Sequence, residues 1–313
     1  MTGSTGLIGR ALVKRLEAEG HEALPVLRPA NPGPQQPGDA AAQAEQPGDA
    51  AARVIEWDPA ADRIDGQAIE GLDAVVHLAG EPIAARRWSS AQKRRIADSR
   101  TRGTALLAGA LARLDTPPSV LVSASAIGYY GDRGDERLDE SSNVGSDFLA
   151  RVCHDWESAA DPAREAGIRV VHPRTGVVLS QSGGALAEML PFFRLGIGGR
   201  VGSGRQWMSW ITLHDEVEAL LWLLSADVDG PVNLTAPDPV TNRELTAALG
   251  RALRRPTLLP VPKPALWARL GRELTEALLY SSARVAPALL ARRGFRFAHP
   301  DIATALDAVL APA

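Results

Sequence analysis

The chain has little cysteine and no strong excess of charge of either sign. Cys153 is the only cysteine among 313 residues, which excludes an internal disulfide and any multi-cysteine metal site, and its helix-forming neighbours predict a buried, inert thiol. The net charge is −3, so nothing marks a nucleic-acid-binding surface. No apolar run approaches the roughly 18 residues of a membrane span, and no signal peptide is recognisable. We therefore expect a cytoplasmic protein with no nucleic acid, membrane or metal among its partners.

What stands out instead is the opening segment, residues 1–9 (MTGSTGLIG). Gly3, Gly6 and Gly9 follow a G-x-x-G-x-x-G spacing, directly ahead of apolar residues that recur at helical spacing. A turn of this kind brings the pyrophosphate of a dinucleotide against backbone N–H groups at a helix N-terminus. The sequence therefore predicts a dinucleotide-binding turn.

Such a turn normally follows a buried parallel strand, but only Met1 and Thr2 precede it here. Without that central strand, its two neighbours would lose backbone partners, at a cost that exceeds a typical domain stability of about 5–15 kcal/mol. We therefore expect Met1 to be a misassigned start, with the natural protein beginning about six to ten residues earlier.

Strand-like and helical segments alternate through the first half of the chain. After the helix that Gly20 ends, apolar runs predict strands over residues 21–27, 54–57, 74–79, 120–123 and 168–172, with helices over 89–114 and 146–165. This alternation predicts an α/β fold: a doubly wound parallel sheet of Rossmann type over residues 1–180, with its first strand missing. Residues 29–52 repeat QPGDAA and are predicted to be a low-complexity surface loop.

The second half of the chain differs in amino-acid composition. Glycines crowd residues 183–204, a capping box at Thr241–Glu244 opens a helix to about Arg254, and prolines are frequent from 256 to 264. We expect residues 181–313 to form a smaller α/β lobe on the substrate side, ending in a small C-terminal domain over 256–313.

The end of the strand at 21–27 predicts which dinucleotide binds. The residue that reads the adenosine ribose belongs about 20 residues after the glycine turn, and Arg28 stands there, after Leu27. A guanidinium suits a 2′-phosphate, whereas an acidic residue would repel it. The sequence therefore favours NADP(H) over NAD(H); the alternative is that Arg28 is a solvated surface arginine.

Several motifs occur in an order that resembles a known family. They are TGSTGLIG (2–9), HLAGEPI (77–83), RRW (86–88), SR (99–100), SASAIGYYG (123–131), DFLARVCHDWE (147–157), PRTGVVL (173–179) and SWITLHD (209–215). Together they resemble the extended (atypical) short-chain dehydrogenase/reductase superfamily. Within it, the chain is similar to the nucleoside-diphosphate-sugar epimerase-like subgroup, which has a small C-terminal domain.

The resemblance implies a Rossmann-type domain with NADP(H) across the carboxyl ends of the strands, and a homodimer through paired helices. Residues at the pyrophosphate, the adenosine ribose phosphate, the middle of the cofactor and the nicotinamide would be, in chain order, Gly3, Thr5, Gly6, Leu7, Ile8, Leu27, Arg28, Leu78, Ala79, Gly80, Arg100 and Val178.

The catalytic pattern of the superfamily is not present. Relatives use a Tyr with a Lys four residues later, whose charge lowers the pKa of the phenol. Phe148 and Val152 occupy these slots, and a shift by one residue gives Asp147 and Arg151. We expect Ser125 and Tyr129 to act instead. The alternative is that Tyr129 and its neighbour Tyr130 are packing residues.

On the substrate side, Gln206, Trp207 and Trp210 combine amide and aromatic groups that suit a sugar face or a flat ring; the two tryptophans fit a core equally well. The sequence predicts an NADP(H)-binding, epimerase-like oxidoreductase acting on a small hydroxylated or carbonyl substrate, such as a nucleotide sugar. The alternative is a non-catalytic NADP(H)-binding redox sensor or regulatory protein, which the missing Tyr/Lys pair favours.

Overall fold

The structure, a computed structural model, describes residues 1–29 and 54–311. The surface loop predicted over 29–52 falls almost entirely outside these residues, and only Pro29 lies within them.

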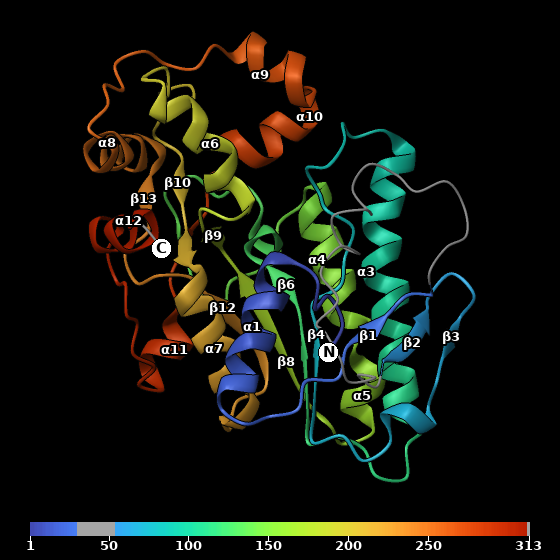
Figure 1. Cartoon of the computed structure of the whole chain (residues 1–313). Helices are drawn as coiled ribbons and strands as arrows, with labels where there is room; N and C mark the ends of the chain where they lie inside the picture. The colour runs from blue at the N-terminus through green and yellow to red at the C-terminus, as the bar shows by residue number, and fades with distance from the viewer. Residues whose placement is uncertain (30–53, 312–313) are drawn as a thin grey trace.

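A parallel sheet forms the centre of the molecule (Figure 1). Thr2 bridges to Val26 on one side and to His77 on the other, and so joins the two halves of the sheet. The sheet then reads, from one edge to the other, β2 (Ile55–Asp58), β1 (Val26–Leu27), Thr2, β4 (Ala74–His77), β5 (Val120–Ser123), β8 (Arg169–Thr175) and β12 (Gly230–Leu234). β3 (Arg63–Ile64) pairs antiparallel with β2, and β6 (Ser125–Ala126) pairs parallel with β8. The predicted α/β class is confirmed.

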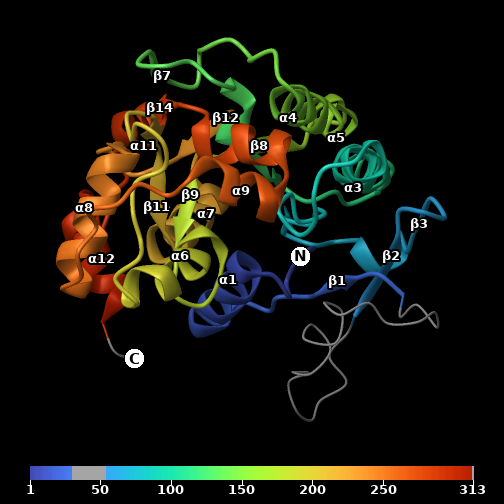
Figure 2. The ribbon, with the colours of Figure 1, turned by 90° about the horizontal axis from the view of Figure 1, so that it is seen from above.

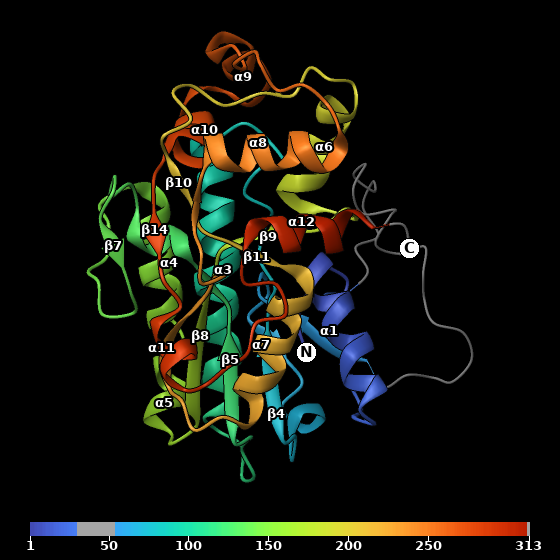
Figure 3. The same cartoon turned by 90° about the vertical axis from the view of Figure 1, so that its left-hand side faces the viewer.

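Helices cover both faces of this sheet, as Figures 2 and 3 show. One face packs against α1 (Leu7–Ala18) and α7 (Leu213–Ser225), and the other against α3 (Ser90–Leu111), α4 (Phe148–Ser158) and α5 (Asp161–Glu165). The strands are apolar along most of their length because both faces are buried: all four residues of β5 are inaccessible to solvent.

Some element boundaries differ from the predicted ones, because contacts with other segments of the chain determine where those elements begin and end. The strand predicted over 21–27 is only Val26–Leu27, because Met1 and Thr2 are the sole described backbone on that side for it to pair with. The helix predicted over 146–165 breaks at Ala159–Ala160 into α4 and α5. Gly20 does end α1, with a φ of +83° that favours glycine.

The second half leaves the sheet and returns to it. After β9 (Val177–Leu179), α6 (Gly184–Arg194), β10 (Trp207–Met208) and β11 (Trp210–Thr212) build the lobe, and α7 and β12 come back to the sheet. The chain then forms β13 (Val240–Thr241), α8 (Asn242–Leu253), α9 (Lys263–Leu270), α10 (Arg272–Thr275), a π-helical turn (Glu276–Tyr280), β14 (Arg284–Val285), α11 (Ala288–Arg292) and α12 (Ile302–Leu310). The capping box at Thr241 and Glu244 is confirmed. The lobe is therefore interleaved with the sheet rather than a separate C-terminal block.

Three short elements complete the described chain: η1 (Gln67–Ile69), η2 (Ile127–Tyr130) and β7 (Arg137–Leu138). β7 pairs with β14, and this pairing ties the loop that follows η2 to the C-terminal region.

One carboxyl group lies buried between the sheet and α7. Glu216 is 1% exposed, and its Oε1 accepts a hydrogen bond of 2.7 Å from the Thr175 hydroxyl. Its Oε2 is buried and has no partner among the described residues. Burial raises the pKa of Glu216 to about 8, because the ionised form loses its hydration there. The side chain is therefore mostly protonated at neutral pH.

This buried carboxyl predicts how stability depends on pH. Because its folded pKa of about 8 lies above its ordinary value of 4.5, folding should lose stability as pH rises between these values. Glu216→Gln keeps the site neutral at every pH. We expect its free energy of unfolding, relative to the unchanged protein, to increase by about 4 kcal/mol from pH 5 to pH 8, at about 1.4 kcal/mol per pH unit.

Urea unfolding at the two pH values measures this difference, and Glu17→Gln, at an exposed position of α1, serves as the matched control. A Glu216→Gln effect that is the same at both pH values would contradict a raised pKa.

Candidate functional site

The glycine turn lies at the carboxyl end of the short central strand. Gly3 has a φ of +68°, and a Cβ there would lie 2.8 Å from the Leu78 carbonyl carbon. A Cβ on Gly9 would lie 2.0 Å from the Gly3 oxygen. Both positions therefore require glycine. Thr5 and Gly6 are exposed at the turn.

The helix that follows the turn is open to an anion. Gly6 is its N-cap residue and supplies no side-chain hydrogen bond, and no acidic residue lies in the first turn, which Leu7 and Ile8 begin. The first N–H groups of a helix have no intrahelical acceptor, so this end of α1 offers donors and a positive dipole. The local structure fits the predicted pyrophosphate site.

Hydrogen bonds hold the turn against the end of β4. The Leu78 and Ala79 amides donate to the Thr2 carbonyl oxygen and Oγ1, at 3.4 and 3.2 Å. Thr2 Oγ1 is also 2.7 Å from His77 Nδ1, and His77 Nε2 is 3.0 Å from the Thr104 hydroxyl. Burial lowers the pKa of His77 to about 3, so its imidazole is neutral and acts as a structural bridge.

The other predicted cofactor residues lie around the same edge of the sheet. Leu27 ends β1 and Arg28 follows it, exposed to solvent. Arg100, on α3, donates to the carbonyls of Glu81 and Ile96 at 3.0 and 3.2 Å. Its guanidinium also lies beside Gly80, where a Cβ would be 3.1 Å from Cζ.

Val178 comes to this edge through packing with the glycine turn's helix. A Cβ on Gly184 would lie 3.5 Å from the Val178 oxygen and 3.7 Å from Leu7 Cδ2. The structure thus places the segment of Val178 next to the start of α1, although 170 residues separate them in the sequence.

The two slots of the missing catalytic pair lie on the first turns of α4. Phe148 stacks edge-on against Trp88, with ring centroids 5.1 Å apart, and the Lys93 ammonium lies 5.4 Å from its ring centroid. Lys93 is ion-paired with Glu273 of α10 at 2.7 Å. Val152 is buried at 5% exposure. Neither Phe148 nor Val152 carries a group that exchanges a proton.

Ser125 belongs to a buried polar network. It is 4% exposed, and its hydroxyl donates to Glu157 Oε1 at 2.7 Å. Arg174 Nε and Nη2 each donate to the Glu157 carboxylate at 2.8 Å, a bidentate ion pair with side-chain exposures of 3% and 13%. Arg174 Nη1 donates to the Tyr130 hydroxyl at 3.0 Å, and Tyr130 donates to Asn233 Oδ1 at 2.6 Å. The network therefore runs from β6 to β12.

The two tyrosines differ within this network. Tyr130 is fully buried, and burial raises the pKa of its phenol to about 12, which fits a packing residue with a satisfied hydroxyl. Tyr129 is partly exposed, and the Arg174 guanidinium lies 3.4 Å from its ring centroid. Arg174 therefore positions Tyr129 directly and Ser125 through Glu157.

The predicted substrate-binding residues lie on or beside β10 and β11. Gln206 is buried and donates to the carbonyls of Val201 and Leu279. The Trp207 indole donates to Asp135 at 2.8 Å and is partly exposed. Trp210 is 1% exposed, packs in the core of the lobe and donates to the Asp238 carbonyl at 3.0 Å. Of the three, Trp207 presents the most surface to a ligand.

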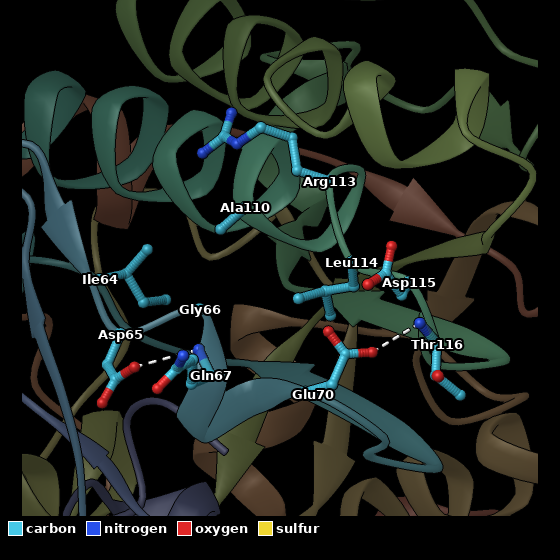
Figure 4. A pocket seen from close by; sticks show the side chains of 10 residues that line it. All are labelled: Ile64, Asp65, Gly66, Gln67, Glu70, Ala110, Arg113, Leu114, Asp115 and Thr116. Carbon is cyan, nitrogen blue, oxygen red and sulfur yellow. Dashed lines mark hydrogen bonds between the residues drawn. The ribbon is translucent and has the colours of Figure 1, made fainter.

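A hollow of about 800 Å³ lies at the opposite edge of the sheet, before the start of β4 and β5 (Figure 4). Two of its three acidic side chains accept local hydrogen bonds: Asp65 accepts the amides of Gln67 and Ala68, and Glu70 accepts that of Thr116. This hollow is remote from the glycine turn. Within residues 1–29 and 54–311, no group of three or more His, Cys, Asp or Glu side chains is placed to hold a metal ion.

Sequence reasoning did not identify Glu157, Arg174 or Glu216 as notable. A charged residue inside the apolar run of β8 was the one available signal for Arg174. Cys153 is buried as predicted, and burial raises the pKa of its thiol to about 12.

Two family models match the chain. That of the NAD dependent epimerase/dehydratase family matches residues 1–235, and that of a domain of unknown function (DUF1731) matches residues 261–309. An epimerase family protein of Mycobacterium bovis is 45% identical over 307 residues, which are 98% of this chain and 95% of the relative.

Solved structures of epimerases are also similar to this chain. A crystal structure of human epimerase family protein SDR39U1 (isoform 2) with NADPH is similar at a TM-score of 0.80 and 33% identity, and covers 98% of this chain and 97% of that one. The UDP-glucose 4-epimerase of Thermotoga maritima with UDP-glucose has a TM-score of 0.72 at 16% identity, with 99% and 96% covered. At that identity the likeness shows a shared fold alone.

The bidentate Glu157–Arg174 pair predicts a large effect of a small substitution. Glu157→Gln leaves the Arg174 charge buried without a counter-ion, which typically costs about 3 kcal/mol or more. We expect that loss in urea unfolding followed by circular dichroism. Glu136→Gln removes the carboxylate of an exposed pair with Arg133 and should cost less than about 1 kcal/mol. Equal losses of stability in the two variants would show that the buried Glu157–Arg174 pair costs no more to break than an exposed pair.

Proposed function

Because the chain belongs to the NAD-dependent epimerase/dehydratase family, we propose that it binds NADP(H) and works as an epimerase-like oxidoreductase. Its substrate would be a small hydroxylated or carbonyl compound, such as a nucleotide sugar, in the cytoplasm. A homodimer through paired helices stays a prediction.

The single observation that carries the cofactor proposal is the glycine turn with its uncapped helix. Gly3 packs on the Leu78 backbone, and α1 begins with no side-chain cap and no acidic residue. A phosphate group would find free N–H donors there. The NADPH in the human relative, at 33% identity over nearly the whole chain, supports the same choice.

We assign the cofactor contacts from this edge of the sheet. Gly3, Thr5, Gly6, Leu7 and Ile8 would hold the pyrophosphate, and Leu27 and Arg28 the adenosine ribose phosphate. Further along, Leu78, Ala79, Gly80, Arg100 and Val178 would line the rest of the cofactor. Arg28 is exposed and forms no ion pair with another described residue, so its guanidinium is available to a 2′-phosphate.

When bound, the nicotinamide ring supplies or accepts a hydride at a substrate carbon. A hydroxyl proton must then move as well, and Phe148 and Val152 provide no group for it. We propose Tyr129 as the proton-exchanging group and Ser125 as a hydrogen-bonding partner. Because the Ser125 proton is given to Glu157, its oxygen would accept a hydrogen bond from the substrate. The Arg174 guanidinium over the ring fixes Tyr129.

On the substrate side we propose Trp207 and Gln206 as the contacts. Arg284 lies 4.1 Å from the Trp207 ring centroid and fixes its plane. Trp210 is kept out of this proposal because its side chain is enclosed by the lobe core.

A non-catalytic NADP(H)-binding protein is the second candidate. The observation that favours it is the first two turns of α4, where Phe148 and Val152 replace the proton-transferring pair and pack against neighbours. Such a protein would sense the cofactor without turning it over.

Arg28 tests the cofactor choice. Arg28→Ala should weaken NADPH binding by about tenfold or more, because a charge-assisted contact to phosphate is worth about 1.5–3 kcal/mol, and should leave NADH binding nearly unchanged. Isothermal titration calorimetry measures both. Arg113→Ala, at an exposed position near the end of the first long helix α3, is the matched control. Equal weakening of NADPH and NADH would remove Arg28 from the 2′-phosphate.

Turnover separates the two candidate functions. NADPH consumption is followed with a panel of carbonyl compounds and nucleotide sugars, together with product stereochemistry. For any substrate turned over, Tyr129→Phe should lower kcat by about 10²-fold without changing NADPH affinity. Tyr280→Phe removes a phenol from the π-helical turn and is the control. Tight NADPH binding with no turnover across the panel would favour the non-catalytic candidate.

A further inference from the structure

Large apolar side chains are exposed at one end of the lobe. Leu258 is 84% exposed, Leu259 77%, Leu195 74%, Ile197 65% and Phe192 42%. Elsewhere in the described chain, only Val54 at 47% and Val144 at 38% are comparable. Single exposed apolar residues are normal, whereas a group of them marks an interaction site.

These five residues come from two segments that lie side by side. Val201 and Val261 form a parallel bridge, and the Val261 amide donates to the Arg200 carbonyl at 2.8 Å. A Cβ on Gly199 would lie 1.7 Å from the Leu259 oxygen. We call residues 189–205 and 251–272 together the basic tip. Figure 3 shows its α9 at the end of the molecule away from the start of the parallel strands.

The charge of the basic tip has one sign. It holds nine cations and no Asp or Glu, within a chain whose net charge is −3. The nine are Arg194, Arg200, Arg205, Arg251, Arg254, Arg255, Lys263, Arg269 and Arg272. Among the described residues, carboxylates at its border pair with two of the nine: Glu188 with Arg269 at 2.9 Å, and Glu276 with Lys263 at 2.8 Å. The surface therefore keeps a clear excess of positive charge.

The shape and charge of the tip select among possible occupants. A second copy docked through the tip would bring the same excess of positive charge onto itself, which like-charge repulsion opposes. The leucines protrude, with about four-fifths of Leu258 and Leu259 in solvent, and so form no groove for a peptide. An anionic bilayer matches both features, because arginines bind lipid phosphates while short apolar side chains enter the acyl boundary.

We propose that the basic tip docks the protein onto the surface of a membrane rich in anionic phospholipid. This inference goes beyond the proposed function and does not depend on it. It revises the expectation of no membrane partner, which rests on the lack of a spanning segment in the sequence. No helix in the described part of the chain has the length and apolar character needed to cross a bilayer; docking requires only surface contact.

Docking would rest on two separable contributions. Each cation near an anionic surface adds about 1 kcal/mol, and this attraction is screened by salt. The exposed leucines add a hydrophobic contribution to the binding free energy, which salt does not screen. Both should therefore be visible when the two kinds of residue are changed separately.

Vesicle sedimentation of the full chain tests the proposal, with vesicles of phosphatidylcholine alone and of phosphatidylcholine mixed with phosphatidylglycerol. We expect binding to the mixed vesicles only, weakened by salt. The double variant Arg254→Gln/Arg255→Gln should weaken it about thirtyfold, from about 1 kcal/mol per charge. Leu258→Ser/Leu259→Ser should weaken it about tenfold or more, and because both side chains are exposed this variant should keep its thermal unfolding midpoint.

The matched control is Val144→Ser/Arg63→Gln, which changes an exposed apolar residue and an exposed cation away from the tip and should bind vesicles unchanged. Equal binding to both vesicle types, or none, overturns the proposal. Binding to soluble polyglutamate that the leucine variant does not alter would point to an acidic protein instead. A dimer in light scattering that the tip variants dissociate, without vesicle binding, would point to a second copy.

Discussion

The structure depends on a two-residue stretch of backbone at the centre of the sheet. Thr2 donates to Val76 and accepts from Leu78, while Met1 accepts from Val26, so these bonds join the two halves of the parallel sheet. The Thr2 side chain continues the connection through His77 to Thr104 on α3. Gly3 and the start of α1 are positioned as a consequence, because the turn packs on the backbone at the end of β4. The proposed phosphate site is thus an outcome of how this short strand is held.

Two adjacent residues of β8, Arg174 and Thr175, contact buried carboxyl groups on opposite faces of the sheet. Arg174 and Thr175 point to different sides, as neighbours in a strand must. On one side Arg174 meets Glu157 in a bidentate pair; on the other, Thr175 meets the solitary carboxyl of Glu216. The paired charge is stable because its partner is buried with it, whereas Glu216 pairs with no cation among the described residues and takes up a proton. Adjacent residues of β8 therefore contact a buried ion pair on one face of the sheet and a titrating carboxyl of α7 on the other.

The polar network also links the lobe to the sheet. Asn233, which accepts from Tyr130, donates to the carbonyl of Ala286 in the C-terminal region. Glu140 accepts the amides of Asn233 and Leu289. The loop that carries Tyr129 is thereby held from both sides, by Arg174 and by the C-terminal segment. The same lobe carries the basic tip, so the surface proposed to meet a membrane and the proposed substrate residues Gln206 and Trp207 belong to one structural unit.

Local features of the structure could be predicted from the sequence. The glycine turn, the end of α1 at Gly20 and the capping box at Thr241 all follow from residues within a few positions of one another, where steric limits and short-range hydrogen bonds decide the conformation. The pairing of Glu157 with Arg174, the lone carboxyl of Glu216 and the close approach of Gly199 to Leu259 depend instead on the three-dimensional fold. Each of these joins segments that lie apart in the chain, and their energies come from burial, which no local pattern records. The net charge of −3 likewise gives no sign of the basic tip, because it is a sum over the whole chain and does not say where the charges lie in space.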